Sequence, residues 1–173
     1  MKICVVSDSH DNGQSLARCL SAAKAEGATV AIHCGDIIGT NTLKAALAVG
    51  LPLHAIHGNN LGDPGSLCRL AAKANGLLMY HGQDAVLELG GRRVFMVHYP
   101  HYGQAMALTG DYDLVCCGHS HDPVVHEIMN IRGELCWLIN PGSTAGLGVP
   151  KATWIMGDLD VMHFEIRDVP PAP

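Results

Sequence analysis

Long hydrophobic runs are missing from this 173-residue chain. A membrane-spanning helix needs ~20 consecutive apolar residues, and the longest candidate, residues 45–53, is interrupted by Gly50 and Pro52. The apolar run after Lys2 ends before Asp8, which is too short for a secretory signal. We therefore expect no membrane partner and no secretion.

Clusters of basic residues are missing as well. The chain has 11 Lys and Arg residues against 16 Asp and Glu residues, which gives a formal net charge of −5, and its basic residues are scattered. Proteins that hold nucleic acid through its phosphates need positive charge gathered on one surface. The sequence therefore argues against nucleic acid as a surface partner.

The seven cysteines form no recognisable framework. Their number is odd and no CxxC pair occurs, so neither a set of disulfides nor a zinc knuckle is indicated. Most of them lie in apolar segments, as Cys4, Cys116 and Cys117 do. Buried free thiols are typical of proteins in a reducing compartment, and we expect a cytoplasmic location.

Apolar sequence is present in the amount that one folded domain needs. Hydrophobic residues make up 48% of the chain and charged residues 16%, a balance that excludes disorder over most of its length. We expect a single domain over residues 1–167. Residues 168–173 are expected to form a flexible tail, because its prolines cannot join a sheet.

The first half of the chain alternates buried strands with amphipathic helices. Strands are predicted at residues 2–7, 29–33 and 53–56. The helix after the first strand ends at Gly27, the second helix is capped by Thr40 or Thr42, and the third opens at Pro64. This half is predicted to be a βαβαβ unit.

The second half is dominated by hairpin signals. Paired strands are predicted to flank Gly90-Gly91, Arg132-Gly133 and the segment 157–160. The predicted strand ranges are 85–89 with 93–97, 124–131 with 134–139, and 152–156 with 161–166, with a further strand at 114–117. A βαβαβ unit followed by hairpins indicates an α/β protein with mixed sheets covered by helices.

Metal-capable side chains follow five of these strands. In chain order they are Asp8 and His10, then Asp36, Asn59, His98, and the pair His119 and His121. Ligands of α/β proteins gather outside the carboxyl ends of strands, so we expect these side chains to meet. Seven mixed nitrogen and oxygen ligands suit two borderline divalent ions such as Mn, Fe, Ni or Zn. A bridging carboxylate would hold two such ions ~3.5–4 Å apart, as in hydrolytic two-metal sites.

Each of these segments also has an ordinary structural interpretation. Residues 8–10 could be a turn, residues 35–36 a capping loop, and residues 119–121 a polar loop. Asn59 could be a turn residue and His98 a half-buried histidine at a strand end. All five segments in order, each at the end of a strand, favour a metal site instead.

The order D-x-H … G-D … G-N … H … G-H-x-H formed by these residues resembles the calcineurin-like metallophosphoesterase superfamily. Gly118-His119-Ser120-His121, followed by Asn140-Pro141-Gly142-Ser143, is similar to its small bacterial and archaeal phosphodiesterase branch. The resemblance spans residues 2–166. It implies a four-layer fold, in which two mixed β-sheets pack face to face with helices outside.

The resemblance also implies how the seven ligands divide between two metals. One metal would be held by Asp8, His10 and His121. The other would be held by Asn59, His98 and His119. Asp36 would bridge the two, and a hydroxide between the metals would be the nucleophile. Asp36, Asn59 and His98 are the residues that we expect at the catalytic step.

The activity implied by the resemblance is metal-dependent hydrolysis of a phosphodiester or an activated phosphomonoester. The expected partner is a small phosphate ester, and a homo-oligomer is left open. We expect Asn60 and His101 to contact the substrate. Many relatives carry a histidine where Asn60 stands, and an amide cannot protonate a leaving group. Relatives often read H-G-H at His98, whereas here Pro100 intervenes, stiffens the loop and displaces His101 by one residue.

Two other classes of function share parts of this pattern. The same fold serves as a scaffold subunit of the eukaryotic retromer complex with a degraded metal site, but all seven ligands are intact here. A protein that binds NAD or NTP through the βαβ half is the second alternative, and residues 7–13 contain neither GxGxxG nor GxxxxGK.

Three details stay open at the level of sequence. His33 and His57 lie beside the motifs, and each either orients a ligand or is a strand-end histidine satisfied by the backbone. The segment 140–143 either lines the site or forms a tight turn.

Overall fold

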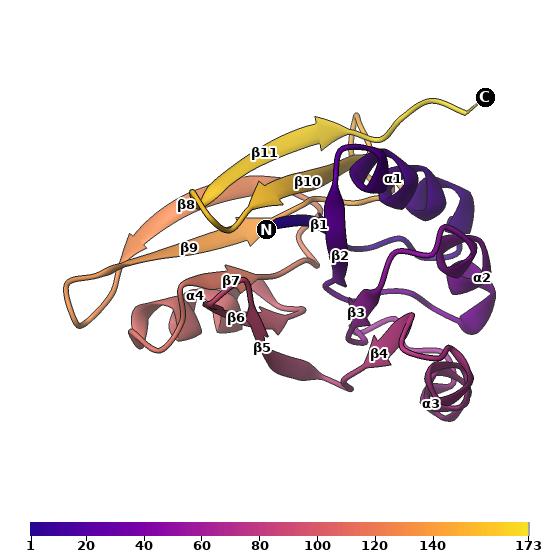
Figure 1. Ribbon diagram of the computed structural model, residues 1–173, viewed down its shortest axis with the longest axis horizontal. Coiled ribbons are helices and arrows are strands. Elements are labelled where there is room, and N and C mark those ends of the chain that lie inside the picture. Colours follow the sequence, from indigo (N-terminus) through magenta and orange to yellow (C-terminus); the bar gives the residue numbers. More distant parts are fainter. Residues whose placement is uncertain (173) are drawn as a thin grey trace.

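The computed structural model describes residues 1–172. In its first half, each strand is followed by a helix that returns the chain to the same edge of the sheet, so consecutive strands lie parallel. The elements are β1 (Lys2–Val6), α1 (Gly13–Ala25), β2 (Ala28–His33), α2 (Thr40–Ala48), β3 (Leu53–Ala55), α3 (Pro64–Lys73) and β4 (Leu78–Tyr80). Their order and spacing follow the predicted βαβαβ pattern (Figure 1).

The second half consists mainly of hairpins. Its elements are β5 (Asp84–Leu89), β6 (Arg92–Val97), α4 (Pro100–Leu108), β7 (Leu114–Cys116), β8 (Val124–Met129), β9 (Leu135–Asn140), β10 (Thr153–Asp158) and β11 (His163–Asp168). The pairs β5–β6, β8–β9 and β10–β11 are antiparallel, as the turn signals predicted.

These strands form two mixed sheets. The six-stranded sheet has the order β11-β10-β1-β2-β3-β4, and the five-stranded sheet has the order β5-β6-β7-β9-β8. The C-terminal hairpin joins the first sheet because β10 pairs antiparallel with β1. The prediction of mixed sheets covered by helices is confirmed.

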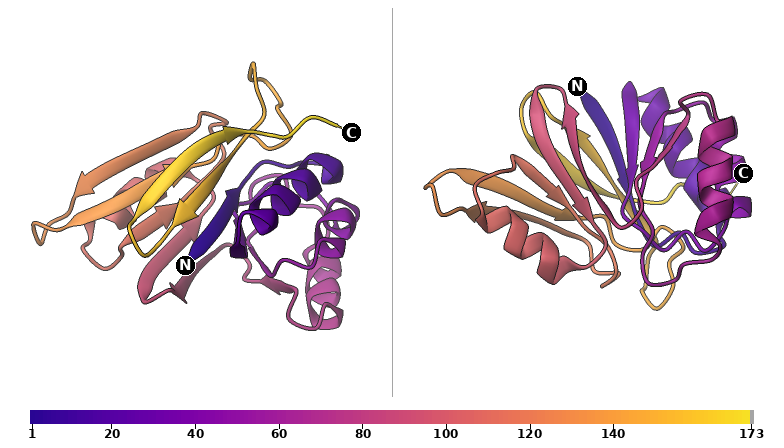
Figure 2. Two further views of the ribbon diagram at one scale, coloured as in Figure 1. Left: turned by 45° about the horizontal axis from the view of Figure 1, so that its top comes forward. Right: turned by 90° about the horizontal axis from the view of Figure 1, so that it is seen from below.

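The alternation of side chains along the strands produces three apolar interfaces and therefore four layers (Figure 2). In β1, Val5 packs between the two sheets, while Val6 packs under α1, α2 and α3. In β6, Val94 packs between the sheets, while Phe95 faces α4 on the outer side. The four-layer arrangement implied by the resemblance is confirmed.

Helix α4 was not predicted. Its buried residues are Gly103 and Ala107, whose small side chains give little apolar signal. Pro100, expected to stiffen a loop, occupies the first turn of this helix, where its missing N–H is not needed. The prediction of a loop at this place is therefore wrong, because a short pattern of small residues concealed a helix.

Two other local predictions differ from the structure. Helix α2 is preceded by Gly39 as its N-cap rather than by Thr40 or Thr42, and the Thr42 hydroxyl donates instead to the carbonyl oxygen of His10 at 2.9 Å. Gly157 lies inside β10 rather than in the turn. A Cβ atom there would lie 2.9 Å from Ile3, so close packing rather than chain reversal requires the glycine.

The first residues of the segment expected to be a flexible tail are hydrogen-bonded to the domain. The Val169 N–H donates to the carbonyl of Ala152 at 2.9 Å, and Arg18 of α1 donates to the carbonyl of Pro170 at 2.7 Å. Residue 173 lies outside the described residues. The boundary of the domain at residue 167 stays a prediction.

The environment of the cysteines agrees with their apolar sequence context. Six of the seven are buried free thiols, and Cys68 is exposed. Between residues 1 and 172, no helix has both the length and the apolar character required to cross a bilayer.

Candidate metal centre

The carboxyl ends of strands from both sheets meet at one edge of the molecule. The Asp8 N–H donates to the carbonyl of Gly35 at 3.0 Å, which joins the loops after β1 and β2. In the second sheet, the Gly118 N–H donates to the carbonyl of His98 at 2.9 Å. The two halves are connected directly, because the backbone N–H of His119 donates to Oδ2 of Asp8 at 2.9 Å.

The backbone at this edge adopts unusual conformations. Five of the seven predicted ligands have positive φ angles, namely Asp8 (51°), His10 (44°), Asp36 (57°), His119 (68°) and His121 (60°). Non-glycine residues adopt this region rarely, and strain of this kind is concentrated at functional sites. The conformations therefore support a functional role for these loops.

The first cluster of donor atoms comprises Asp8, His10 and His121. One potential ligand atom from each lies within 4.8 Å of the others. Nε2 of His121 lies 3.2 Å from Oδ1 of Asp8, and the His10 and His121 rings meet edge to face with centroids 5.6 Å apart. This cluster has the same members as the first ligand set implied by the sequence resemblance.

The second cluster comprises Asp8, Asp36 and His98, all buried. Nε2 of His98 lies 3.3 Å from Oδ1 of Asp36 and 3.0 Å from Oδ1 of Asn59. The His119 ring follows with its centroid 5.1 Å from that of His98. Asp8 is thus common to both clusters, whereas the resemblance assigns the bridging position to Asp36.

The hydrogen bonds of two histidines define which ring nitrogen has a free lone pair. Nδ1 of His98 lies 2.7 Å from the carbonyl oxygen of Cys34, and Nδ1 of His121 lies 2.7 Å from that of Leu147. A carbonyl only accepts, so Nδ1 carries the proton in both rings. In a neutral imidazole, Nε2 then presents a lone pair to the neighbouring carboxylate and amide oxygens. The nitrogen and oxygen lone pairs repel each other, and a cation bound between them would remove this repulsion by coordinating both.

Unpartnered polar atoms lead to the same inference. Among residues 1–172, three buried side-chain oxygens or nitrogens lack a hydrogen-bond partner: Ser7 Oγ, Asp8 Oδ1 and His10 Nε2. Such atoms are costly unless something satisfies them. All three belong to the loop after β1, and two of them are atoms of Asp8 and His10 in the first cluster, so the donor set fits a divalent cation there.

Asp36 is held in its ionised form by Asn60. The backbone N–H of Asn60 donates to Oδ1 of Asp36 at 2.8 Å, and its side-chain amide donates to Oδ2 at 2.5 Å. Burial raises the pKa of the Asp36 carboxyl, but these two hydrogen bonds together with the nearby His98 and His10 outweigh burial, and the pKa falls below its usual value. Asn60, expected to contact substrate, therefore uses its amide group to hold a candidate ligand.

Two glycines permit the close approach of the ligand loops. A Cβ atom on Gly58 would lie 2.7 Å from Nε2 of His98 and would collide with Asp36. A Cβ atom on Gly118 would lie 2.7 Å from Oδ2 of Asp8. Any larger residue at either position would displace candidate ligands.

His33 connects the loop after β2, which carries Asp36, to the loop after β1, which carries Asp8. Its Nδ1 accepts the N–H of Gly35 at 3.2 Å, so its Nε2 carries the proton and donates to Ser9 Oγ at 2.8 Å. Burial, reinforced by the nearby His98, lowers the pKa of His33 to about 3. The open question about His33 is thus answered: it is a neutral residue that positions the loop.

Further polar residues hold the loops from the opposite side. The side-chain amide of Asn140 donates to the carbonyl of Gly118 and to Ser120 Oγ, both at 2.9 Å, and Ser143 Oγ donates to the carbonyl of Asp8 at 3.1 Å. Segment 140–143 therefore supports the site. Thr42 and Ser9 were missed, because nothing in their sequence context distinguishes them from ordinary loop hydroxyls.

A cleft of about 280 Å³ opens beside the second cluster. Its lining residues are His57, Gly58, Asn59, Leu61, Gln83, Val97, His98 and Tyr99. Nδ1 of His57 lies 2.5 Å from the Tyr80 hydroxyl, and burial together with His98 lowers the pKa of His57. Tyr99 was also missed by sequence reasoning. His101 is exposed on α4 and contacts Tyr99 and Tyr102 rather than a candidate ligand.

Two facing mixed sheets bring carboxylate, imidazole and amide groups together where their strands end, an arrangement that fits a metal-binding protein of the α/β class. The comparison with known families specifies the class further. Residues 1–161 match the model of the calcineurin-like phosphoesterase superfamily domain, and the chain belongs to this family. It is therefore a metal-dependent phosphoesterase, as the sequence resemblance predicted.

Individual relatives cover nearly the whole chain. Phosphodiesterase MJ0936 of Methanocaldococcus jannaschii is 28% identical over 175 residues, which cover 98% of this chain and 98% of the relative. The structure of an archaeal phosphodiesterase has a TM-score of 0.84 at 23% identity and covers 97% of this chain and 99% of its own. The structure of the phosphoesterase YfcE from E. coli has a TM-score of 0.67 at 19% identity, with 98% and 100% covered.

Proposed function

We propose that this chain hydrolyses phosphodiesters or activated phosphomonoesters with two divalent transition metal ions, drawn from Mn, Fe, Ni and Zn. Residues 1–167 would form its one catalytic domain. The observation that carries the proposal is the arrangement of His98 and His121, whose Nε2 atoms face oxygens while Nδ1 donates to a carbonyl. The relative named a phosphodiesterase supports diesters as substrates.

The first proposed ligand set coincides with the first cluster, whereas the second shares only His98 with the second cluster and adds the two side chains that His98 contacts. The first set is Asp8, His10 and His121, and the second is Asn59, His98 and His119. We assign the bridge to Asp36, because its Oδ1 lies 3.3 Å from His98 and because His10, a member of the other set, is near enough to lower the pKa of this carboxyl. When bound, the two ions supply an activated water as nucleophile and offset the charge of the phosphate.

The chain itself would orient the substrate. Asn59 turns Oδ1 toward His98, which leaves its Nδ2 to donate to a phosphate oxygen. The carbonyls of Cys34 and Leu147 orient the rings of His98 and His121, so that Nε2 of each ring is the nitrogen that faces the proposed metals. Hydrogen bonds from Asn60 favour the ionised form of Asp36.

The test combines metal analysis with hydrolysis. The protein is stripped with a chelator, reloaded with Mn, Fe, Ni or Zn in separate samples, and assayed on bis(p-nitrophenyl) phosphate and p-nitrophenyl phosphate. We expect two ions per chain. Asp36→Ala is expected to reduce loading at both positions and to abolish hydrolysis, while His121→Ala is expected to lose about one ion, because each ion takes its own ligand set.

The matched control is His163→Ala. His163 is an exposed residue at the start of β11, where it pairs with Asp158, and Asp158 in turn pairs with Lys2 at the start of β1. The candidate centre follows the other end of β1, so His163 is distant from it. This variant should load and hydrolyse as the wild type does. A wild-type protein that takes up no transition metal, or an Asp36→Ala variant that keeps two ions, would show that the assignment is wrong.

A further inference from the structure

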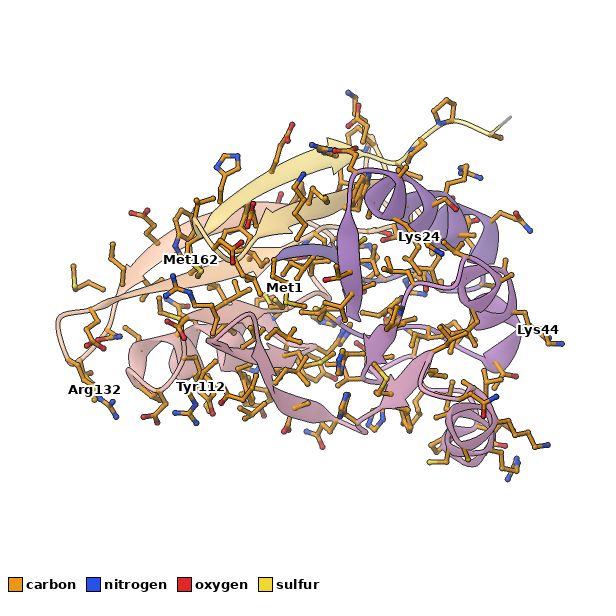
Figure 3. All side chains as sticks on the ribbon, in the orientation of Figure 1. Met1, Lys24, Lys44, Tyr112, Arg132 and Met162 are labelled. Carbon is orange, nitrogen blue, oxygen red and sulfur yellow. The ribbon has the colours of Figure 1, made fainter. Side chains whose placement is uncertain are left out.

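The cleft beside the second cluster opens directly onto the proposed centre, because Asn59 and His98 form part of its wall. Its remaining walls carry no formal charge: none of the described residues that line it is Lys, Arg, Asp or Glu. The labelled basic side chains lie elsewhere, with Lys24 and Lys44 at the helices α1 and α2 and Arg132 at the β8–β9 hairpin (Figure 3). A second phosphate or an ammonium group would find no opposite charge in this cleft.

The cleft instead combines uncharged polar side chains with apolar and aromatic ones. Val97 is buried in its wall, and Leu61 is 40% exposed beside it, an apolar surface that is open to a ligand. Gln83 and His57 supply hydrogen-bonding groups, and the His57 ring is fixed by the Tyr80 hydroxyl. An uncharged group with an apolar face and a polar edge matches these walls.

Tyr99 is the aromatic wall of the cleft. Its ring meets those of His98 and His119 edge to face, with centroids 5.2 Å and 4.8 Å away, and it is therefore held next to the proposed centre. The side chain makes no capping hydrogen bond, although Tyr99 is the N-cap residue of α4. A planar ring against tyrosine gains stacking energy that a saturated group of the same size does not.

We propose that this cleft binds an uncharged aromatic substituent of the phosphoester and that Tyr99 determines this specificity. The inference rests on the proposed function, because the phosphate must sit at Asn59 and His98. A volume of about 280 Å³ lies at the lower end of ordinary ligand pockets and suits one ring system rather than an oligomer. The substrate class is therefore a small ester with one aromatic group beside the phosphate.

Phosphonates test the cleft without hydrolysis, because their carbon–phosphorus bond is not an ester. Binding to the metal-loaded protein is measured by calorimetry for phenylphosphonate, cyclohexylphosphonate and 2-aminoethylphosphonate, which share the head group and differ in the substituent. We expect phenylphosphonate to bind about fivefold or more tightly than cyclohexylphosphonate, as stacking on one aromatic ring predicts. The cationic aminoethyl compound should bind most weakly of the three.

Variants assign the preference to Tyr99. Tyr99→Ala should remove the preference for phenyl over cyclohexyl, and Tyr99→Phe should keep it. Tyr112→Ala alters a ring that lies outside the cleft lining and packs on Phe95, with centroids 5.0 Å apart, and should leave the preference unchanged. Circular dichroism of each variant verifies folding. Equal affinities for the phenyl and cyclohexyl compounds, tighter binding of the aminoethyl compound, or an unchanged preference in Tyr99→Ala would overturn the inference.

The same preparation separates this inference from the proposed function. If bis(p-nitrophenyl) phosphate is hydrolysed while the phosphonates bind alike, the proposed function stands and the aromatic cleft is rejected. If hydrolysis is absent while phenylphosphonate is still preferred through Tyr99, the cleft stands as an aromatic site and the proposed function is rejected.

Discussion

Residues at the candidate centre adopt conformations that their neighbours must maintain. Each non-glycine residue with positive φ costs on the order of 1–3 kcal/mol, and five of the predicted ligands are of this kind. Hydrogen bonds from Thr42 to the His10 carbonyl and from Ser143 to the Asp8 carbonyl hold the loop after β1 in place. These hydrogen bonds fix the candidate ligands in position before a metal binds, so less conformational entropy is lost on binding.

Asn60 is the residue whose contacts differ most from expectation, and it yields a specific prediction. Asn60→Ala removes the side-chain donor to Asp36 but keeps the backbone donor. Loss of such an outer partner typically lowers metal affinity or activity by about 10–100-fold. The pKa of the Asp36 carboxyl should rise when this donor is lost, and we therefore expect weaker loading of the metals. Titration of the metals with an indicator dye measures this loading.

Asn60→His separates two interpretations of this position. If Asn60 only replaces a lost proton donor, the histidine variant should accelerate esters of poor leaving groups most. If holding Asp36 is its main role, the variant should lose metal affinity first and gain nothing on alkyl esters. The structure favours the second outcome, because both hydrogen bonds of Asn60 end on Asp36.

His33 connects stability to pH. Its pKa of about 3 in the folded protein lies below its usual value of 6.5, so below pH 6.5 the unfolded chain binds a proton that the folded protein does not. Its contribution to the free energy of unfolding is present above pH 6.5 and is lost as pH falls toward 3. The maximal slope from this one group is about 1.4 kcal/mol per pH unit.

Urea unfolding of the metal-free protein between pH 7 and pH 4 measures this dependence. His54 titrates over a similar range, since burial lowers its pKa to about 4, so the wild type alone does not isolate His33. His33→Gln keeps one donor and one acceptor for Ser9 and Gly35 but cannot titrate. We expect a shallower pH dependence in this variant, and identical slopes would contradict the role of His33.

At the residue scale, the sequence predicted which side chains gather at the candidate centre better than it predicted the partners that hold them. The seven candidate ligands were recognisable because each follows a strand and because their order forms a motif. The tautomer of His98 and the role of Asn60 depend on contacts across 64 and 24 positions of the chain. No local pattern carries that information.

Among the elements, α4 shows how packing can hide a helix. It lies on the outer face of the five-stranded sheet through Gly103 and Ala107, which let its backbone approach the strands. A Cβ atom on Gly103 would meet Leu138 at 3.2 Å and Cys117 at 3.4 Å. The helix also positions Tyr99 and His101, so its approach to the sheet determines the shape of the cleft.

Gly103→Leu is therefore expected to destabilise the protein. Overpacking of this kind typically costs about 1–3 kcal/mol in the free energy of unfolding, because the helix must move away from the sheet. Gln104→Leu, at the next and exposed position of α4, is the matched control and should have little effect. Both are compared by urea unfolding, and equal stability of the two variants would contradict the packing argument.

At the scale of the whole molecule, the sequence predicted the architecture because its two halves have different patterns. Alternating strands and helices produced the parallel part, and glycine-containing turns produced the hairpins. What it did not predict was that β10 and β11 return to the first sheet beside β1. This pairing joins the ends of the chain, and it depends on contacts that no periodic pattern records.

The same topology makes the proposed metals a link between the two sheets. Asp8 and Asp36 follow strands of the six-stranded sheet, while His98 and His119 follow strands of the five-stranded sheet. An ion that binds only the folded arrangement stabilises it by mass action, by about 2.7 kcal/mol at a free concentration of 100 times Kd. For a chain of this size, that corresponds to an increase in Tm of about 5–10 °C.

Thermal unfolding after chelation and after addition of Mn²⁺ measures this increase. The wild type and the distant variant His163→Ala should both show the full increase in Tm, because both keep all the proposed ligands. His121→Ala should gain a smaller shift, since the second set remains, and Asp36→Ala should gain least because it would contribute to both ions. If Mn²⁺ raises the Tm of all four proteins equally, the ions bind elsewhere, and the two sheets are held together by their apolar interface alone.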